Sequence, residues 1–105
     1  MTIREIEFDP DKAAQNWKYH KVMFEDAALV FADPMRLERL DDSIGNISGE
    51  ERWQTLGKVG EVLFVVYTER VGKTRLISAR IANRREKRSY YGDDNDNDKR
   101  WTKAD

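Results

Sequence analysis

The sequence predicts a single α+β domain in which two helices come early, a set of strands follows, and a short helix ends the fold. Residues 62–69, VLFVVYTE, are almost all apolar, β-branched or aromatic, as in a strand buried on both faces. Glycine-containing turns at 58–61 and 70–73 separate this run from strand-like neighbours, which predicts an antiparallel meander. A chain of 105 residues can bury one core. We assign the domain to residues 1–91 and expect residues 92–105 to form a polar tail that is flexible or loosely docked.

Two helices are predicted in the N-terminal third of the chain. Asp9 is a good N-cap and Pro10 a good first helical residue, so the first helix begins there. Apolar residues recur at helical spacing over 24–32, and Pro34 ends this second helix. Both helices therefore have one apolar face. We expect them to cover one face of the sheet and to leave the other face partly open.

Five segments have strand character, and the predicted order of elements is β-α-α-β-β-β-β-α with an antiparallel sheet. The strands cover residues 3–8, 36–40, 51–58, 62–69 and 74–82. The polar segment 41–50 contains two glycines and is predicted to be a loop. In the last strand, simple alternation places Leu76 and Arg80 on one face and Arg75 on the other.

The C-terminal helix is predicted to begin at Arg84. Asn83 and Glu86 have the spacing of a capping box, with Asn in place of the usual Ser or Thr. Arginine in a first helical turn is opposed by the helix dipole, by roughly 0.3–1 kcal/mol. Helix N-termini and guanidinium groups both bind phosphate. An anion bound there would therefore offset the cost of these charges.

Positive charge is concentrated near the C-terminus, although the formal net charge of the chain is only −1. Segment 70–91 holds eight basic side chains against Glu86 alone. The basic residues are Arg70, Lys73, Arg75, Arg80, Arg84, Arg85, Lys87 and Arg88. Local potential decides whether a polyanion is attracted, so this segment favours a nucleic acid or an acidic partner.

Composition excludes several classes of site. The chain has no cysteine, which rules out disulfides, thiolate metal sites and cysteine nucleophiles, and it has one histidine, His20. No apolar run is long enough to span a bilayer, and the N-terminus lacks a signal-peptide core. We therefore expect a cytoplasmic protein that needs no metal or other cofactor and no membrane.

The residue types that remain suit RNA cleavage without a metal ion. In that reaction the ribose 2′-OH needs a base, the leaving 5′-oxygen needs an acid, and the phosphoryl oxygens need cations. DNA lacks the 2′-OH and cannot react in this way. Structural interpretations stay open for most candidates: His20 can be a packed histidine, Trp53 and Tyr67 core aromatics, and Glu51 with Arg52 a solvated loop end. The arginines of 75–88 fit a structural role least well.

Three separated segments resemble the BrnT toxins, small ribonucleases of type II toxin–antitoxin systems. They are FDPDKAAQNWKYHKVMFEDAALVFADP (8–34), GEERWQTLGKVGEVLFVVYTER (49–70) and RLISARIANRREKRSYY (75–91), so that the resemblance spans about residues 6–91. It implies a RelE-like fold and an endoribonuclease that inhibits translation. It also implies neutralisation by a cognate BrnA-like antitoxin, with operator DNA bound only through the toxin–antitoxin complex.

The resemblance also selects residues. The positions that match its patterns are His20, Glu51, Arg52, Tyr67, Arg75, Arg80 and Arg84. Two positions depart from the family pattern: Lys21 stands where a glycine usually follows the histidine, and Met23 where a Ser usually caps the second helix. The first departure bears on the pose of His20, and the second on stability.

We therefore predict a metal-independent ribonuclease toxin with these roles. Arg80 and Arg84 bind the scissile phosphate, His20 or Glu51 acts as base or acid, and Tyr67 orients a base or the 2′-OH. The expected RNA-binding residues are Arg52, Arg75, Lys87 and Arg88. One rival is an inactive or regulatory member whose basic segment binds an acidic antitoxin or nucleic acid. A direct DNA binder is a third possibility, although no helix-turn-helix pair is visible.

Overall fold

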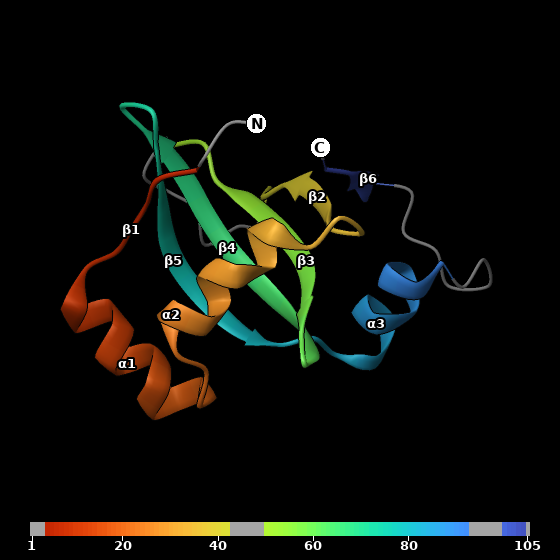
Figure 1. The fold of residues 1–105 in the computed structure, drawn as a ribbon, viewed down its shortest axis with the longest axis horizontal. Helices are drawn as coiled ribbons and strands as arrows, with labels where there is room; N and C mark the ends of the chain where they lie inside the picture. The colour runs from red at the N-terminus through yellow and green to blue at the C-terminus, as the bar shows by residue number, and fades with distance from the viewer. Residues whose placement is uncertain (1–3, 43–49, 93–99, 105) are drawn as a thin grey trace.

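The computed structural model describes residues 4–42, 50–92 and 100–104, and these form a six-stranded sheet with helices packed against it (Figure 1). The strands, in sheet order, are β1 (Ile6–Glu7), β5 (Lys73–Ile81), β4 (Glu61–Arg70), β3 (Trp53–Val59), β2 (Leu37–Leu40) and β6 (Thr102–Lys103). The helices are α1 (Pro10–His20), α2 (Phe24–Ala27), the 3-10 helix η1 (Ala28–Ala32) and α3 (Arg84–Tyr91). The predicted α+β class is confirmed. The pairing of β1 with β5 is parallel, and the other neighbours are antiparallel.

Local sequence signals explain where the elements begin and turn. The side chain of Asp9 accepts a hydrogen bond from the backbone N–H of Asp11, which caps α1. Gly60 has a φ of +73° between β3 and β4. The β4–β5 turn has two left-handed residues, Val71 and Gly72, as a tight hairpin requires. The helix predicted over 24–32 is a short α-helix that continues as a 3-10 helix.

The end of the chain docks more firmly than the sequence analysis expected. Trp101 is buried, and its ring meets that of Phe64 edge to face with centroids 6.4 Å apart. Thr102 and Lys103 then pair with β2 as a sixth strand. Of the two alternatives for the tail, residues 100–104 therefore follow docking, because one buried aromatic residue anchors them. Residues 93–99 and 105, and positions 43–49 of the predicted loop, lie outside the described residues.

A β-bulge changes which side chains of β5 share a face. Ser78 pairs with Val66, but Leu76 pairs with Tyr67, so Ile77 is an extra residue without a partner. Leu76 and Arg80 consequently lie on opposite faces, contrary to the simple alternation predicted above. The same bulge moves Arg75 to the face that carries Arg80. The sequence alone gave no sign of this extra residue.

The core consists of two hydrophobic clusters, one on each face of the sheet. On one face, which we call the helix side, α1, α2 and η1 pack over residues such as Val65 and Tyr67 of β4. On the opposite face, the α3 side, Phe64 and Val66 pack with Trp101 and with Tyr90 of α3. In Figure 1, α2 crosses in front of the sheet and α3 lies at its right. None of the helices within the described residues is long and apolar enough to cross a membrane.

Candidate functional site

Arg80 occupies the α3 side of the sheet, where one carboxylate holds it. Its Nη1 and Nη2 donate to the two carboxylate oxygens of Glu86 over 2.8 and 2.9 Å, and its guanidinium lies 4.1 Å from the centroid of the Phe64 ring. Glu86 also accepts from the backbone N–H of Asn83, while Asn83 accepts from that of Glu86. The predicted capping box is therefore present. Glu86 thus fixes Arg80 beside the start of α3.

The outer face of α3 is strongly basic. Arg84, Lys87, Arg88 and Tyr91 line a shallow groove of about 440 Å³. The β3–β4 hairpin extends this surface, because its Glu61 lies 3.6 Å from the Nζ of Lys87. The groove therefore combines three cations with an aromatic ring, which is 62% exposed. Cations that follow a phosphate backbone and rings that stack on bases are the usual elements of single-stranded RNA binding.

Two further arginines lie on the α3 side towards the other end of the strands. Arg75 pairs in register with Thr68 and forms an ion pair of 3.0 Å with Glu7. Arg52 directly precedes Trp53, whose ring packs on the helix side, so alternation places Arg52 on the α3 side. The Nε of Arg52 is buried and has no hydrogen-bond partner. Arg52, Arg75 and Arg80 thus share one face of the sheet with α3.

Carboxylates accompany these arginines, and the whole surface keeps an excess of positive charge. Glu50 accepts two hydrogen bonds from Arg70, which are the main reason why its pKa is lowered, and Arg52 adds to the effect. The charged side chains discussed on this face are seven cations, Arg52, Arg70, Arg75, Arg80, Arg84, Lys87 and Arg88, and four anions, Glu7, Glu50, Glu61 and Glu86. Such a surface attracts a polyanion.

Asp33 holds α3 in place. Its Oδ2 accepts from the Tyr90 hydroxyl at 2.5 Å and from the backbone N–H of Lys58 at 2.8 Å. Burial raises the pKa of Asp33, but the hydrogen bonds from Tyr90, Met35 and Lys58 outweigh burial and lower it. The pKa of Tyr90 is raised, chiefly by burial and then by the hydrogen bond that its hydroxyl donates to Asp33. This carboxylate therefore joins η1, β3 and the basic helix.

Tyr67 is separated from the arginines predicted to act with it. It is buried on the helix side, packs edge to face against Phe31, and donates a 3.1 Å hydrogen bond to Glu38. Burial, and then the charge of Glu38, raise the pKa of Tyr67 to about 12. Tyr67 and Arg80 are on opposite faces of the sheet, so the structure does not bring them into one site.

His20 and Glu51 are both exposed, at places far apart in the fold. His20 is the last residue of α1, and Lys21 after it takes the left-handed conformation, with a φ of +57°, that a glycine would adopt more easily. No contact within the described residues joins His20 to Arg80 or Arg84. Glu51 precedes β3, next to Arg52, and its carbonyl accepts from the Thr68 hydroxyl at 2.6 Å. Met23 begins α2 without a side-chain cap, as expected.

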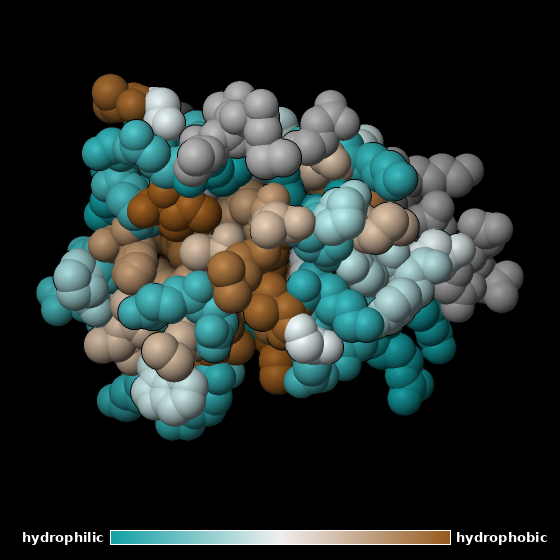
Figure 2. Space-filling model, in the orientation of Figure 1, coloured by the Kyte–Doolittle hydropathy of each residue, from teal (hydrophilic) through white to brown (hydrophobic). Residues whose placement is uncertain are grey.

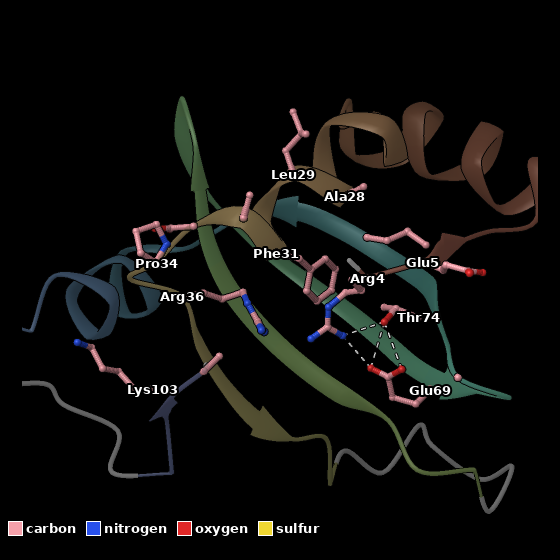
Figure 3. Close-up of a pocket in the computed structure, with 15 residues that line it drawn as sticks. Arg4, Glu5, Ala28, Leu29, Phe31, Pro34, Arg36, Glu69, Thr74 and Lys103 are labelled. Atoms are coloured by element: carbon pink, nitrogen blue, oxygen red, sulfur yellow. Dashed lines mark hydrogen bonds and ion pairs between the residues drawn. The ribbon is translucent and has the colours of Figure 1, made fainter. Parts of the chain in front are cut away.

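Sequence reasoning missed a second cluster, on the helix side (Figure 3). Arg4 and Arg36 extend towards Phe31, with guanidinium carbons 4.6 and 4.9 Å from its ring centroid. Arg36 is only 3% exposed, and its Nη1 donates to Thr55 at 3.1 Å and to Glu38 at 3.5 Å. The spacing of Arg36 and Glu38 in a strand was the one signal that could have revealed their pairing.

Among residues 4–42, 50–92 and 100–104, no three His, Asp or Glu side chains gather as a metal site would require. Residues 8–86 match the family model described as the ribonuclease toxin, BrnT, of a type II toxin–antitoxin system. The chain belongs to this family. No curated protein matches it.

The fold of this BrnT-family protein has a solved counterpart. The crystal structure of the ribonuclease toxin BrnT from Brucella abortus is similar, with a TM-score of 0.55 and 16% sequence identity. The match covers 78% of this chain and 100% of that chain. At this identity the likeness concerns the fold, and it supports the α+β assignment.

Proposed function

We propose that this BrnT-family protein is an endoribonuclease toxin that cleaves RNA without a metal ion and thereby inhibits translation. The observation that carries the proposal is that Arg52, Arg75 and Arg80 lie on the same face of the sheet as the basic groove of α3. The α3 side has both the cations and the exposed ring that a single RNA strand needs. We place the RNA on this surface and the action of the toxin in the cytoplasm.

The arginines would act on the scissile phosphate. Arg80 donates to Glu86 through Nη1 and Nη2, and its Nε has no partner among the described residues, so it retains a donor for a phosphoryl oxygen. Arg84, exposed at the first position of α3, would add a second guanidinium. Arg52 and Arg75 would bind neighbouring phosphates, as would Lys87 and Arg88. Cations aimed at developing negative charge stabilise the transition state more than the ground state.

The covalent step is attack of the 2′-oxygen on the adjacent phosphorus. A new P–O2′ bond forms, the P–O5′ bond breaks, and a 2′,3′-cyclic phosphate and a 5′-hydroxyl result. We assign Glu51 as the base that accepts the 2′-OH proton, because it is an exposed carboxylate next to Arg52 in the chain and precedes β3, so the alternation of the strand does not fix its side chain to the helix side. The 5′-oxygen takes a proton from water. We give Tyr67 no part in the step, because it faces the opposite side of the sheet, and we give His20 none, because it ends α1, which packs on the helix side.

The partner of the toxin follows from its family. We propose that a BrnA-like antitoxin neutralises it, and that operator DNA is bound only by the toxin–antitoxin complex. The antitoxin could prevent cleavage in two ways: by covering the basic surface directly, or by binding elsewhere and changing that surface.

Cleavage of purified RNA in the presence of EDTA tests the proposed activity. We expect fragments that end in a 2′,3′-cyclic phosphate and begin with a 5′-hydroxyl. Matched DNA and 2′-O-methyl RNA should remain intact, because neither offers a 2′-hydroxyl. Intact RNA under these conditions, or cleavage of the 2′-O-methyl strand, would reject this mechanism.

A second candidate is a binding module without catalytic activity. Two observations favour it: Lys21 stands in a left-handed turn where family members usually have glycine, and ion pairs already engage Arg75 and Arg80. Expression of the protein alone separates the two candidates. A harmless protein that copurifies with its antitoxin would support the binding module, whereas growth arrest relieved by the antitoxin would support the ribonuclease.

A further inference from the structure

A large cleft lies on the helix side and has no part in the proposed cleavage. Its volume is about 1070 Å³. Walls from the start of β1, from η1 and from the ends of β4 and β5 surround Phe31 and Arg36 (Figure 3). This volume lies at the upper end of the range for ligand pockets, so the cleft can admit several side chains.

Two guanidinium groups in the cleft have unused donors. Arg4 makes its hydrogen bonds, to Glu69 and Thr74, through Nη1 alone. Arg36 donates through Nη1 to Glu38 and Thr55, and it also interacts with the Tyr67 hydroxyl, whose pKa it lowers. The Nη2 of Arg4 has no partner within the described part of the chain, and the five N–H groups of Arg36 outnumber these three acceptors. Both guanidiniums lie against the ring of Phe31. An isolated anion that enters the cleft can therefore receive hydrogen bonds from a buried and a half-exposed arginine.

The charge of the cleft argues against RNA as its ligand. Its lining has three basic residues, Arg4, Arg36 and Lys103, and three acidic residues, Glu5, Asp33 and Glu69. The balance is therefore neutral, in contrast to the excess of cations on the α3 side. A polyanion would meet the acidic side chains, whereas a single carboxylate could bind between the arginines without approaching Glu5.

Apolar side chains surround the cleft. Leu29 of η1 lines it and is 56% exposed, and Met35 nearby is 52% exposed. Figure 2 shows hydrophobic residues in the middle of this face, over α2 and the segment that follows it. Exposed apolar side chains next to polar groups are typical of surfaces that bind another protein.

We propose that this cleft binds a segment of the antitoxin that places one Asp or Glu carboxylate between Arg4 and Arg36 and an apolar side chain against Leu29. The inference rests on the proposed function for the existence of that partner. It puts this contact on the opposite side of the sheet from the RNA. The antitoxin can therefore stay attached to the toxin whether or not RNA occupies the α3 side.

Titration of the antitoxin, coexpressed from the adjacent gene and purified, against variants of the full-length toxin tests the inference. Arg4→Ala removes one guanidinium, and Leu29→Asp puts a carboxylate at the exposed rim, where it repels the incoming one. Each should weaken antitoxin binding by about tenfold or more and leave RNA cleavage unchanged. The matched controls are Leu40→Asp, at an exposed leucine that does not line the cleft, and Lys12→Ala on α1. Both should bind the antitoxin like the wild type.

The outcomes distinguish this inference from the proposed ribonuclease activity. The inference would be overturned if Arg4→Ala and Leu29→Asp are folded, as judged by circular dichroism, and still bind the antitoxin with wild-type affinity. Displacement of the antitoxin by adenosine monophosphate would also overturn it. Loss of binding in Arg84→Ala with Lys87→Ala, but not in Leu29→Asp, would also overturn it. The wild-type toxin and all variants could fail to cleave RNA while Arg4→Ala and Leu29→Asp still weaken antitoxin binding. In that case the ribonuclease proposal fails and the cleft inference stands.

Discussion

Arginine has two different environments on the two faces of this sheet. On the helix side, Arg36 is 3% exposed and lies among Phe31, Thr55 and Glu38. On the α3 side, Arg75 pairs with Glu7 while their side chains remain 27% and 37% exposed. Water screens the second pair, so exchange of its carboxylate for a phosphate costs little. The difference separates arginines that stabilise the fold from arginines that are available to RNA.

Replacement of each arginine by methionine should give the largest contrast between the faces. Arg36→Met removes the donor to Thr55 and leaves Glu38 with the Tyr67 hydroxyl alone, so we expect a loss of about 3 kcal/mol in the free energy of unfolding. Arg75→Met removes only the solvent-screened ion pair with Glu7 and should lower the free energy of unfolding by less than about 1 kcal/mol. Urea denaturation measures both values. Equal losses would break the distinction between the two faces.

Gly57 tests how tightly the helix side is packed. A Cβ built at this position would meet the Cβ of Val30 in η1 at 2.6 Å. Gly57→Ala should therefore destabilise the protein by about 1–3 kcal/mol through overpacking. Combining it with Val30→Gly removes the Cβ that the new methyl group would meet, so the double variant should be more stable than the sum of the single losses predicts. Additive losses in thermal unfolding would show that η1 does not pack as described.

Sequence patterns predicted much of the fold because its signals are local. Asp9, the two hairpin turns and the Asn83–Glu86 capping box each depend on a few neighbouring residues, and each is present. The bulge at Ile77 was not predictable, because pairing of β5 with β4 decides it. Docking of Trp101 was missed for a related reason, since its partner Phe64 is distant in sequence.

The candidate site was predicted less completely than the fold. The concentration of arginines over 75–88 was visible in the composition, but the face that each would occupy depended on the bulge. The bulge places Arg75 on the face of Arg80, and Tyr67 lies on the opposite face of the sheet. The pairing of Arg4 and Arg36 around Phe31 joins β1, η1 and the start of β2. No local pattern brings these three segments together.

Tyr91 sharpens the account of the α3 side. Its exposed ring in the basic groove offers a stacking surface, and stacking contributes roughly 1–3 kcal/mol per base. Tyr91→Ala should weaken binding of a 2′-O-methyl RNA oligomer by about tenfold, as measured by fluorescence anisotropy. Tyr19→Ala, at a similarly exposed ring on α1, should bind like the wild type. A greater loss in Tyr19→Ala would place the RNA on the other side of the molecule.

Tyr67 tests the helix side through pH. Its pKa is raised to about 12 in the folded protein from 10.0, so its neutral form is favoured by folding. The resulting stability is complete below pH 10 and is lost as pH rises towards 12. Tyr67→Phe should lose about 1 kcal/mol at neutral pH with its hydrogen bond to Glu38, and should show a smaller decline from pH 10 to 12. Urea denaturation at each pH measures this decline in stability. An identical decline in the wild type and in Tyr67→Phe would contradict this assignment.

The salt dependence of RNA binding gives the smallest expected effect. Each phosphate contact contributes about 0.7 to the slope of log K against log salt for a single strand. Lys87→Gln should reduce that slope by about this amount, whereas Lys12→Gln on α1 should leave it unchanged. If both variants have the wild-type slope, Lys87 does not contact a phosphate.

RNA cleavage by the double variant Arg80→Ala, Arg84→Ala tests the central claim most directly. Its matched control is Lys12→Ala with Lys18→Ala, which removes the same charge from exposed positions on α1. Circular dichroism and thermal unfolding confirm that each protein is folded, which matters because Arg80 pairs with the capping residue Glu86. We predict that the arginine variant loses cleavage by at least about a hundredfold while the lysine variant cleaves at the wild-type rate. Wild-type cleavage by a folded arginine variant would contradict the assignment of the active surface to the α3 side.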